Sequence, residues 1–324
     1  MKSTKNLLPF LFLILIGCQS KSEVYYHLQG EIFRTKYNIK YQYNRPLNQE
    51  IEEKLKAFDL SLNPFNRSSV IYKINNNIDS TVDEWFKTVF LKAFEISELT
   101  GGSYDITTAP LINLWGFGFE KIGEATPEKV DSLKQFVGYR KIRLKSDQII
   151  KEDPRVQLNA SSIAKGFSCD VIAELLESYE INDYMVEIGG EIRAKGLNPN
   201  GECWQIQIDI PIDDITGDIH ERMKIIPLCN QSLATSGNYR NYFVKDGKKY
   251  AHTIDPFSGY PAESNLLSVS VVYSDCMTAD AWATAFMTMD LEKAIALAKT
   301  IPGLNYLFIY MDEETGAFST TQNF

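Results

Sequence analysis

The stretch LATSGNYRNYFVKDGKKYAHTIDPFSGYPAE, residues 233–263, decides the fold class, because it places a hairpin signal between two strand-like runs. We expect one strand to end at Gly237, and Asp246-Gly247 is a dipeptide typical of two-residue turns that reverse the chain. The returning strand then leads to His252. Strands joined by such a turn are antiparallel, so this stretch favours a sheet of antiparallel character.

Runs of alternating apolar and polar residues, typical of strands with one buried face, occur on both sides of this stretch. They cover residues 37–43, 141–145, 184–196, 204–210, 266–273 and 306–320. Segments with helical features lie between them: apolar residues at 47, 51, 55, 58 and 62, a helix over 83–100 that ends at Gly101, and a helix capped by Thr126 that starts at Pro127 and stops before Gly138. Because no regular strand–helix–strand repeat is present, we expect an α+β fold with a largely antiparallel or mixed sheet and packed helices.

The composition limits the classes of protein. The chain has 324 residues, of which 44% are hydrophobic and 23% charged, which is ordinary for a globular protein with a sizeable core. No repeat, low-complexity tract or long linker divides it, so we expect one domain. The formal net charge of −9 and the lack of a basic stripe argue against a nucleic-acid partner, whose phosphates would be repelled.

The amino terminus, MKSTKNLLPFLFLILIGC, combines Lys2 and Lys5 with an apolar run over 7–16 that is too short to span a bilayer as a helix. Its last four residues, LIGC, resemble a bacterial lipobox, in which Cys18 would be lipidated. We therefore expect a lipid-anchored protein of the bacterial cell envelope that faces the periplasm or the exterior; a plain secretory signal or a weak anchor is the alternative. The expected division is a signal peptide over 1–17, a tether over 18–29 and a folded domain over 30–324.

The other four cysteines, Cys169, Cys203, Cys229 and Cys276, are widely spaced, and the chain has only three histidines. This spacing does not support a zinc cluster. The cysteines lie in apolar or strand-like contexts, so we expect buried free thiols and no essential disulfide.

Two stretches place polar groups and glycines where a core pattern would have apolar residues. In TGGSYDITTAPLINLWGFG, residues 100–118, Gly101 and Gly102 allow close backbone approach to a ligand and Asp105 supplies an acceptor; a purely structural loop is the alternative. In residues 156–179 we expect a strand that ends at Asn159 and a helix that begins near Ser161 or Ser162. Lys165 then falls in the first turn, where free N–H groups and a lysine form a phosphate cradle; a solvated lysine is the alternative.

Two further stretches carry polar groups suited to catalysis. His252 lies between a strand and a loop in polar company, which makes it a candidate for proton transfer, although a lone histidine is often structural. Asp280 and Thr284 are four residues apart in the helix expected over 274–290, so they share a face that suits a hard cation such as Mg²⁺. Helix capping and backbone hydrogen bonding explain the same spacing equally well. Together, these four stretches indicate chemistry on a phosphoanhydride.

A resemblance to a known family indicates which phosphoanhydride the substrate is. The segments TGGSYDITTAPLINLWGFG, SSIAKGFSCD, VEIGGEIRAKG, ATSGNYRNY, DGKKYAHTIDPFSGYPAE and ADAWATAF resemble, in order, the successive motifs of the ApbE family. The resemblance implies an enzyme that takes FAD as substrate, uses Mg²⁺, transfers FMN to a Thr or Ser hydroxyl of an acceptor protein and releases AMP. The implied acceptors are subunits of membrane redox complexes and other exported flavoproteins.

The resemblance also implies roles for individual residues. Those implied to hold FAD are Phe33, Ser103, Tyr104, Asp105, Asn159, Lys165 and Ile254. Those implied to hold the metal are the carbonyl of Ser162 and the side chains of Asp280 and Thr284. Asp280 thereby acts in catalysis, and His252 is implied to help deprotonate the acceptor hydroxyl.

The chain departs from the family pattern at a few positions. Asn159-Ala160-Ser161 and Ala283 replace residues that are more usual in the family. Asn63 stands where many members have a tyrosine near FAD, and a smaller polar residue there could admit a water molecule that hydrolyses FAD to FMN and AMP. The alternatives are therefore a metal-dependent FAD pyrophosphatase and a flavin-binding lipoprotein without turnover.

Overall fold

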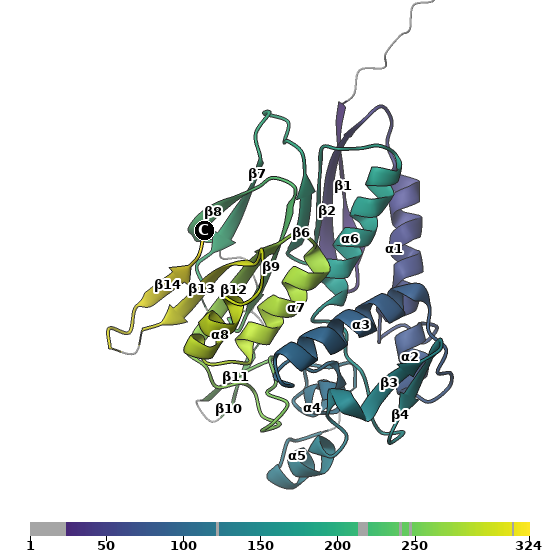
Figure 1. Cartoon of the computed structure of the whole chain (residues 1–324), viewed down its shortest axis with the longest axis vertical. Helices are drawn as coiled ribbons and strands as arrows, with labels where there is room; N and C mark the ends of the chain where they lie inside the picture. Colours follow the sequence, from purple (N-terminus) through teal and green to yellow (C-terminus); the bar gives the residue numbers. More distant parts are fainter. Residues whose placement is uncertain (1–23, 121–122, 213–219, 240–241, 246–247, 313) are drawn as a thin grey trace, which may run out of the picture.

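The central element is an eight-stranded sheet (Figure 1). The computed structural model describes residues 24–120, 123–212, 220–239, 242–245, 248–312 and 314–324. The strands in sheet order are β1 (Val24–Ile32), β2 (Thr35–Tyr43), β5 (Tyr184–Ile188), β6 (Glu191–Lys195), β9 (Gln231–Gly237), β12 (Leu266–Tyr273), β13 (Asn305–Met311) and β14 (Phe318–Gln322). Each neighbouring pair is antiparallel, which confirms the expected α+β architecture.

Helices cover one face of this sheet. Among them, α6 (Ala164–Ser178) packs on β5 and β6 and α7 (Cys276–Met287) packs on β9 and β12, and these two helices lie side by side (Figure 1). The remaining helices are α1 (Asn48–Leu62), α2 (Val70–Asn75), α3 (Glu84–Leu99), α4 (Ala109–Leu114), α5 (Pro127–Lys134), α8 (Leu291–Ala298) and the 3₁₀ turns η1 (Ile106–Thr108) and η2 (Tyr139–Lys141). Because α1 packs on α6 and α3 on α7, the two inner helices are buried between the sheet and an outer layer.

Three strand pairs lie outside the main sheet: β3 (Ile142–Lys145) with β4 (Gln148–Lys151), β7 (Trp204–Asp209) with β8 (Arg222–Leu228), and β10 (Tyr242–Lys245) with β11 (Lys248–Ala251). The β7–β8 pair packs apolar side chains, including Trp204 and Ile226, against Met185 and Ile309 of the sheet. Val186, the neighbour of Met185 in β5, belongs instead to the cluster under α1 and α6. Successive strand residues point to opposite faces, so the sheet is buried on both sides here.

The local signals read from the sequence account for the outer helices. The side chain of Asp83 caps α3 by accepting from the Phe86 N–H, and Gly101 follows that helix with φ of +62°, a conformation that favours glycine. Thr126 caps α5 in the same way, and Pro127 is its first residue. The helices expected from these signals are confirmed.

Three expectations about the chain are wrong. Residues 156–159 form no strand; the side chain of Asn75 instead bonds the backbone N–H and C=O of Leu158 at 2.7 and 2.9 Å. Residues 24–29 belong to β1 and are not a tether, because they pair with β2 over the whole strand.

The third correction concerns the cysteines. Cys203 and Cys229 form a disulfide, because Trp204 pairs with Leu228 and the residues just outside this pair face each other across β7 and β8. Cys169 and Cys276 are free and buried, as expected.

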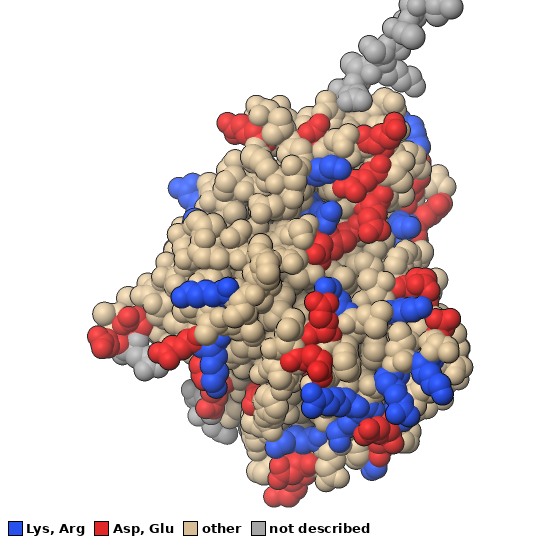
Figure 2. Space-filling view, in the orientation of Figure 1, with Lys and Arg blue, Asp and Glu red and all other residues tan. Residues whose placement is uncertain are grey.

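Figure 2 shows acidic and basic side chains interspersed over the face that carries α3, α6 and α7.

Some expectations fall on residues that the structure does not describe. The signal peptide over 1–17, Cys18 and the turn at Asp246-Gly247 are outside the described ranges. The strands on either side of that turn, β10 and β11, are paired antiparallel, as the hairpin signal predicts. Among the described residues, no helix has the length and apolar character needed to cross a bilayer.

Candidate active site

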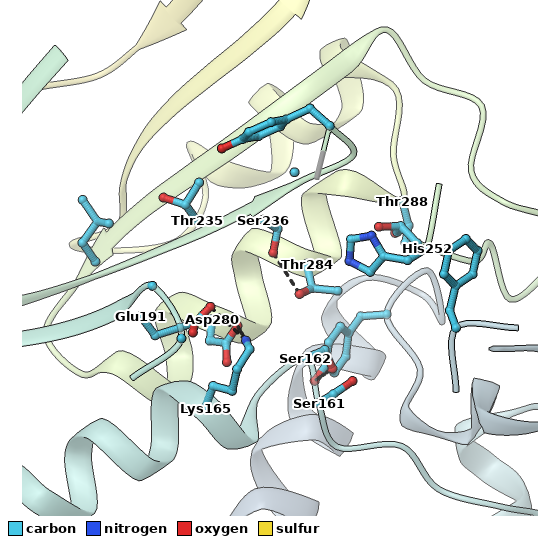
Figure 3. A pocket seen from close by; sticks show the side chains of 18 of the residues that line it. Ser161, Ser162, Lys165, Glu191, Thr235, Ser236, His252, Asp280, Thr284 and Thr288 are labelled. Atoms are coloured by element: carbon cyan, nitrogen blue, oxygen red, sulfur yellow. Dashed lines mark hydrogen bonds and ion pairs between the residues drawn. The ribbon is translucent and has the colours of Figure 1, made fainter. Parts of the chain in front are cut away.

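A cavity of about 700 Å³ lies where the first turn of α6, the middle of α7, the β5–β6 turn and the chain after β11 meet. It contains most of the residues singled out from the sequence: Ser103, Tyr104, Asp105, Asn159, Ser162, Lys165, His252, Ile254, Asp280 and Thr284. In Figure 3, Lys165, Glu191 and Asp280 gather on one side of the cavity, and His252 lies beside Thr284 and Thr288 on the other. Segments far apart in the sequence thus contribute to one polar site.

A tight turn directs α6 toward the cavity. The side chain of Asn159 accepts a 2.9 Å hydrogen bond from the Ser161 N–H, and the Ala164 N–H bonds the Ala160 carbonyl. The helix begins at Ala164, slightly later than expected, and Lys165 is in its first turn as predicted. The Gly166 N–H of this first turn is used by the Asp280 carboxylate, and the start of α6 carries the positive end of the helix dipole, which favours an anion beside it.

The loop at residues 103–108 lines the cavity next to this turn. Tyr104 and Ser162 share a hydrogen bond of 2.9 Å between their hydroxyl groups, and burial raises the pKa of Tyr104 strongly. Asp105 was expected to supply an acceptor to a ligand. Its carboxylate instead accepts from the N–H and hydroxyl of Thr107, at 2.7 and 2.6 Å, and from the Tyr139 N–H at 2.7 Å. In this structure Asp105 therefore holds the loop together.

Lys165 lies between two buried carboxylates. Its Nζ is 2.9 Å from Glu191 Oε1 and 3.7 Å from Asp280 Oδ1. Asp280 is 2% exposed and Glu191 is 3% exposed, so water screens these charges little. The second oxygen of Asp280, Oδ2, accepts a 2.9 Å hydrogen bond from the Gly166 N–H.

These contacts set the pKa values of the three groups in opposing ways. Burial raises the pKa of Asp280 and of Glu191, and in both cases the charge of Lys165 opposes that rise. Burial would lower the pKa of Lys165, but attraction to Asp280 and Glu191 outweighs it and the net shift is upward. Lys165 is therefore a permanent cation at the cavity wall, held by its neighbours.

The face of α7 beside this cluster offers oxygen atoms. Thr284, one turn after Asp280, shares a 3.1 Å hydrogen bond with Ser236 at the end of β9 (Figure 3). Asp280 Oδ1, the Thr284 hydroxyl and the nearby Ser162 form a set of hard oxygen donors. Such donors fit Mg²⁺, which prefers one or two carboxylates and other oxygens. The residues present therefore fit the magnesium ion that the family resemblance implies.

His252 and Ile254 lie at the opposite wall. His252 follows β11 and packs edge-on against Phe117, with ring centroids 6.3 Å apart. The neighbouring Thr253 donates a 3.1 Å hydrogen bond to Asn238, which joins this segment to the end of β9 as the hairpin predicts. His252 is thus fixed on the side of the cavity across from Lys165 (Figure 3).

Two residues expected to hold FAD are not in the described cavity wall. Phe33 is in the β1–β2 turn and packs edge-on against Phe58, with ring centroids 5.6 Å apart. Asn63 follows α1, donates a 2.6 Å hydrogen bond to Asp59 and accepts one from the Phe65 N–H. Asn63 therefore organises a turn in this structure, and its role toward water stays a prediction.

Sequence reasoning missed Glu191 and Ser236. Glu191 lies in the segment VEIGGEIRAKG, which was noticed only as a family motif and a strand run. The available signal was an acidic residue directly after Gly189-Gly190, since a turn with positive φ at both glycines brings the next side chain back toward the sheet edge. Its partner Lys165 is 26 positions earlier, so only the fold shows the pair.

Known proteins share the sequence and the fold of this chain. Residues 33–308 match the model of the ApbE family. A Vibrio cholerae protein called FAD:protein FMN transferase is 37% identical over 298 residues, covering 89% of this chain and 88% of the relative, and a Haemophilus influenzae protein of the same name is 37% identical over 93% of this chain and 90% of its own. A solved structure of a Vibrio cholerae flavin transferase ApbE superposes with a TM-score of 0.83 at 33% identity, covering 93% of this chain and 97% of the other. The apo flavinyl transferase ApbE of Pseudomonas stutzeri gives 0.82 at 30% identity, covering 93% and 95%. The chain therefore belongs to the ApbE family.

Proposed function

We propose that this chain is an FAD:protein FMN transferase, which moves the FMN half of FAD to a Thr or Ser hydroxyl of an acceptor protein and releases AMP. Relatives that share its sequence carry this name, and a solved structure that shares its fold is called flavin transferase ApbE. The observation that carries the proposal is the convergence of Lys165, Asp280, Thr284 and His252 on one cavity. The active site residues themselves are part of the proposal.

The cavity has features that suit a pyrophosphate. Lys165 is a half-buried cation in the first turn of a helix, whose positive dipole end adds to its charge. Ser103, Tyr104 and Asn159 line the cavity as well, and Ile254 lines it on the side of His252; the flavin and adenine parts of FAD would lie against these residues. Phe33 and Asn63, which were expected to take part, are not required by this arrangement.

The metal assignment is the finer part of the proposal. Asp280, Thr284 and the Ser162 carbonyl would hold Mg²⁺, which supplies positive charge that neutralises the pyrophosphate when it is bound. Asp280 Oδ1 is the oxygen left for this role, because Oδ2 accepts from the Gly166 N–H; Lys165 Nζ also pairs with Oδ1, but at 3.7 Å, which is longer than its 2.9 Å pair with Glu191 Oε1.

The transfer step then needs a base for the acceptor hydroxyl. His252 takes the proton from the Thr or Ser hydroxyl as the oxygen attacks the phosphorus of FMN, and a new oxygen–phosphorus bond forms. The anhydride bond to AMP breaks, and AMP leaves with the electron pair of that bond. Lys165 stabilises the negative charge that shifts to the leaving phosphate.

The location and the partners follow from the same proposal. Cys18 would carry a lipid that anchors the chain to a membrane of the bacterial envelope, with the folded domain in the periplasm or at the exterior. Acceptor proteins there would be exported flavoproteins or subunits of membrane redox complexes. Metabolic labelling with a radioactive fatty acid tests the anchor, since Cys18→Ser should remove the label.

One assay separates this function from its alternatives. The full chain is incubated with FAD, Mg²⁺ and a candidate acceptor protein, and the acceptor mass and AMP release are followed together. An acceptor that gains one FMN, with AMP released in equal amount and both lost in Asp280→Ala, supports the transferase. Free FMN and AMP with an unmodified acceptor would indicate a pyrophosphatase, and FAD binding without AMP would indicate a binding protein.

A further inference from the structure

Glu191 lines the cavity, and unlike a surface carboxylate it is buried and paired with a lysine. Its Oε1 is 2.9 Å from Lys165 Nζ, and its Oε2 is buried and has no hydrogen-bond partner among the residues that the structure describes. A buried carboxylate oxygen without a partner is costly, and because Glu191 lines the cavity, a molecule bound there could supply that partner. This cost points to a role in the site.

The turn before Glu191 is built for close contact with Lys165. Gly189 has φ of +69°, and a Cβ atom added there would lie 3.0 Å from Lys165 Cδ and 3.3 Å from Glu191 Oε2. Any other residue at position 189 would therefore crowd both members of the pair. The glycine lets the Lys165 stem and the Glu191 carboxylate pack against the same piece of backbone.

The ion pair between Lys165 and Glu191 keeps the Lys165 ammonium closer to Glu191 than to Asp280. Nζ is 0.8 Å nearer to Glu191 Oε1 than to Asp280 Oδ1, as the distances of 2.9 and 3.7 Å show. If Glu191 lost its charge, the strongest remaining anion beside Nζ would be Asp280. An ammonium bonded directly to Asp280 would compete with a cation for the same oxygen.

We propose that Glu191 is a positioning residue that holds Lys165 away from Asp280 and so keeps Asp280 Oδ1 available to a divalent cation. This inference rests on the proposed function, because it concerns the metal assigned to Asp280 and Thr284. It adds Glu191 to the proposed site and gives its function. Lys165 is needed beside the pyrophosphate, and Glu191 prevents that same lysine from occupying the metal position.

The chain offers a matched control for the loss of one negative charge. Glu187, in β5, also lines the cavity, but its Oε2 accepts a 3.0 Å hydrogen bond from Asn38. No contact between Glu187 and Lys165 is present among the described residues. Glu187→Gln therefore removes a cavity charge without releasing Lys165.

Calorimetric titration with Mn²⁺ and with Mg²⁺, without FAD, tests the proposal on the full chain. We expect Glu191→Gln to weaken metal binding about tenfold or more, as loss of a residue that orients a metal ligand does, and Glu187→Gln to change it less than about twofold. Thermal unfolding of each variant shows whether it is folded before titration.

A double-mutant cycle shows whether Glu191 acts through Lys165. In a Lys165→Met background the competing ammonium is gone, so Glu191→Gln should change metal affinity by less than about twofold. Equal weakening in both backgrounds, or equal weakening by Glu187→Gln, would mean a general charge effect and would overturn the proposal. A wild-type chain that binds neither cation would overturn the metal assignment itself, which separates the two failures.

Discussion

The Gly166 N–H in α6 donates a 2.9 Å hydrogen bond to Asp280 Oδ2 in α7. This contact joins the helix that carries Lys165 to the helix that carries the proposed metal ligands. It is possible because position 166 has no side chain: a Cβ there would be 2.3 Å from the Cys276 carbonyl oxygen and 2.7 Å from Asp280 Cβ. The geometry of the site thus depends on how closely two helices approach.

Gly166→Ala should force these helices apart. The Cys276 oxygen belongs to the backbone and cannot move aside as a flexible side chain could, so we expect a loss of about 1–3 kcal/mol in the free energy of unfolding, measured with urea. The same variant should bind Mg²⁺ and FAD more weakly. Gly201→Ala is the control, because φ is +77° there and the space is open, so it should cost about 1 kcal/mol and leave ligand binding unchanged. Unchanged stability in Gly166→Ala would contradict the close approach.

His252→Ala tests the assignment of the base. We expect the single-turnover rate of acceptor flavinylation to fall about 10²-fold or more, because the acceptor hydroxyl then lacks a positioned base. FAD affinity, followed by flavin fluorescence, should change only a few-fold. His27→Ala, an exposed change on β1, is the control and should have the wild-type rate. A large loss of FAD affinity at an unchanged transfer rate would assign His252 to binding instead.

The Cys203–Cys229 disulfide should stabilise the β7–β8 pair. The bond closes a loop with a sequence separation of 26, which corresponds to about 3.5 kcal/mol in the chain-entropy estimate. Cys203→Ser/Cys229→Ser should lower the free energy of unfolding by a similar amount, and a reductant should lower that of the wild type but not of the variant. Equal sensitivity of both proteins to reductant would show that this bond is absent in solution.

The lowered pKa of Lys151 should make the stability difference between wild type and Lys151→Met depend on pH. Its Nζ donates to the Ile74 carbonyl at 2.7 Å and to Asn77 Oδ1 at 3.1 Å, and burial lowers its pKa to about 8. The unfolded chain, with an ordinary lysine pKa, then binds more protons than the folded one between about pH 8 and pH 10.5, so stability rises with pH in this interval.

The measurement compares wild type with Lys151→Met. The difference in unfolding free energy should move in favour of wild type by about 1 kcal/mol between about pH 7 and pH 10, after allowing for solvent screening of this partly exposed group. Taking the difference at each pH cancels the titration of all other groups. A difference that is constant over this interval would contradict the lowered pKa.

Much of the fold could be predicted from local sequence signals. Thr126 and Pro127 act within one turn of the chain, and they marked the start of α5 correctly because a cap depends on neighbouring residues alone. The 156–159 run failed, since its backbone is satisfied by Asn75, a residue 83 positions from Leu158. A distant side chain here takes the hydrogen bonds that a neighbouring strand would otherwise make. The local sequence carries no sign of this.

The same distinction applies to the candidate site. Asp280 and Thr284 were found because helical spacing places them on one face. Glu191 was not assigned a role, because its importance comes from a contact with Lys165 that the sheet creates. The disulfide was missed because β8 was not recognised as the partner of β7, and their register alone brings Cys203 opposite Cys229.

The central claim is that FAD and a divalent cation bind together in this cavity. A crystal structure of the chain with FAD and Mn²⁺, with anomalous scattering data recorded for manganese, tests it most directly. The account predicts an anomalous peak bonded to Asp280 Oδ1 and the Thr284 hydroxyl, with the FAD pyrophosphate beside Lys165. FAD bound at another surface, or manganese held by residues other than Asp280 and Thr284, would contradict it.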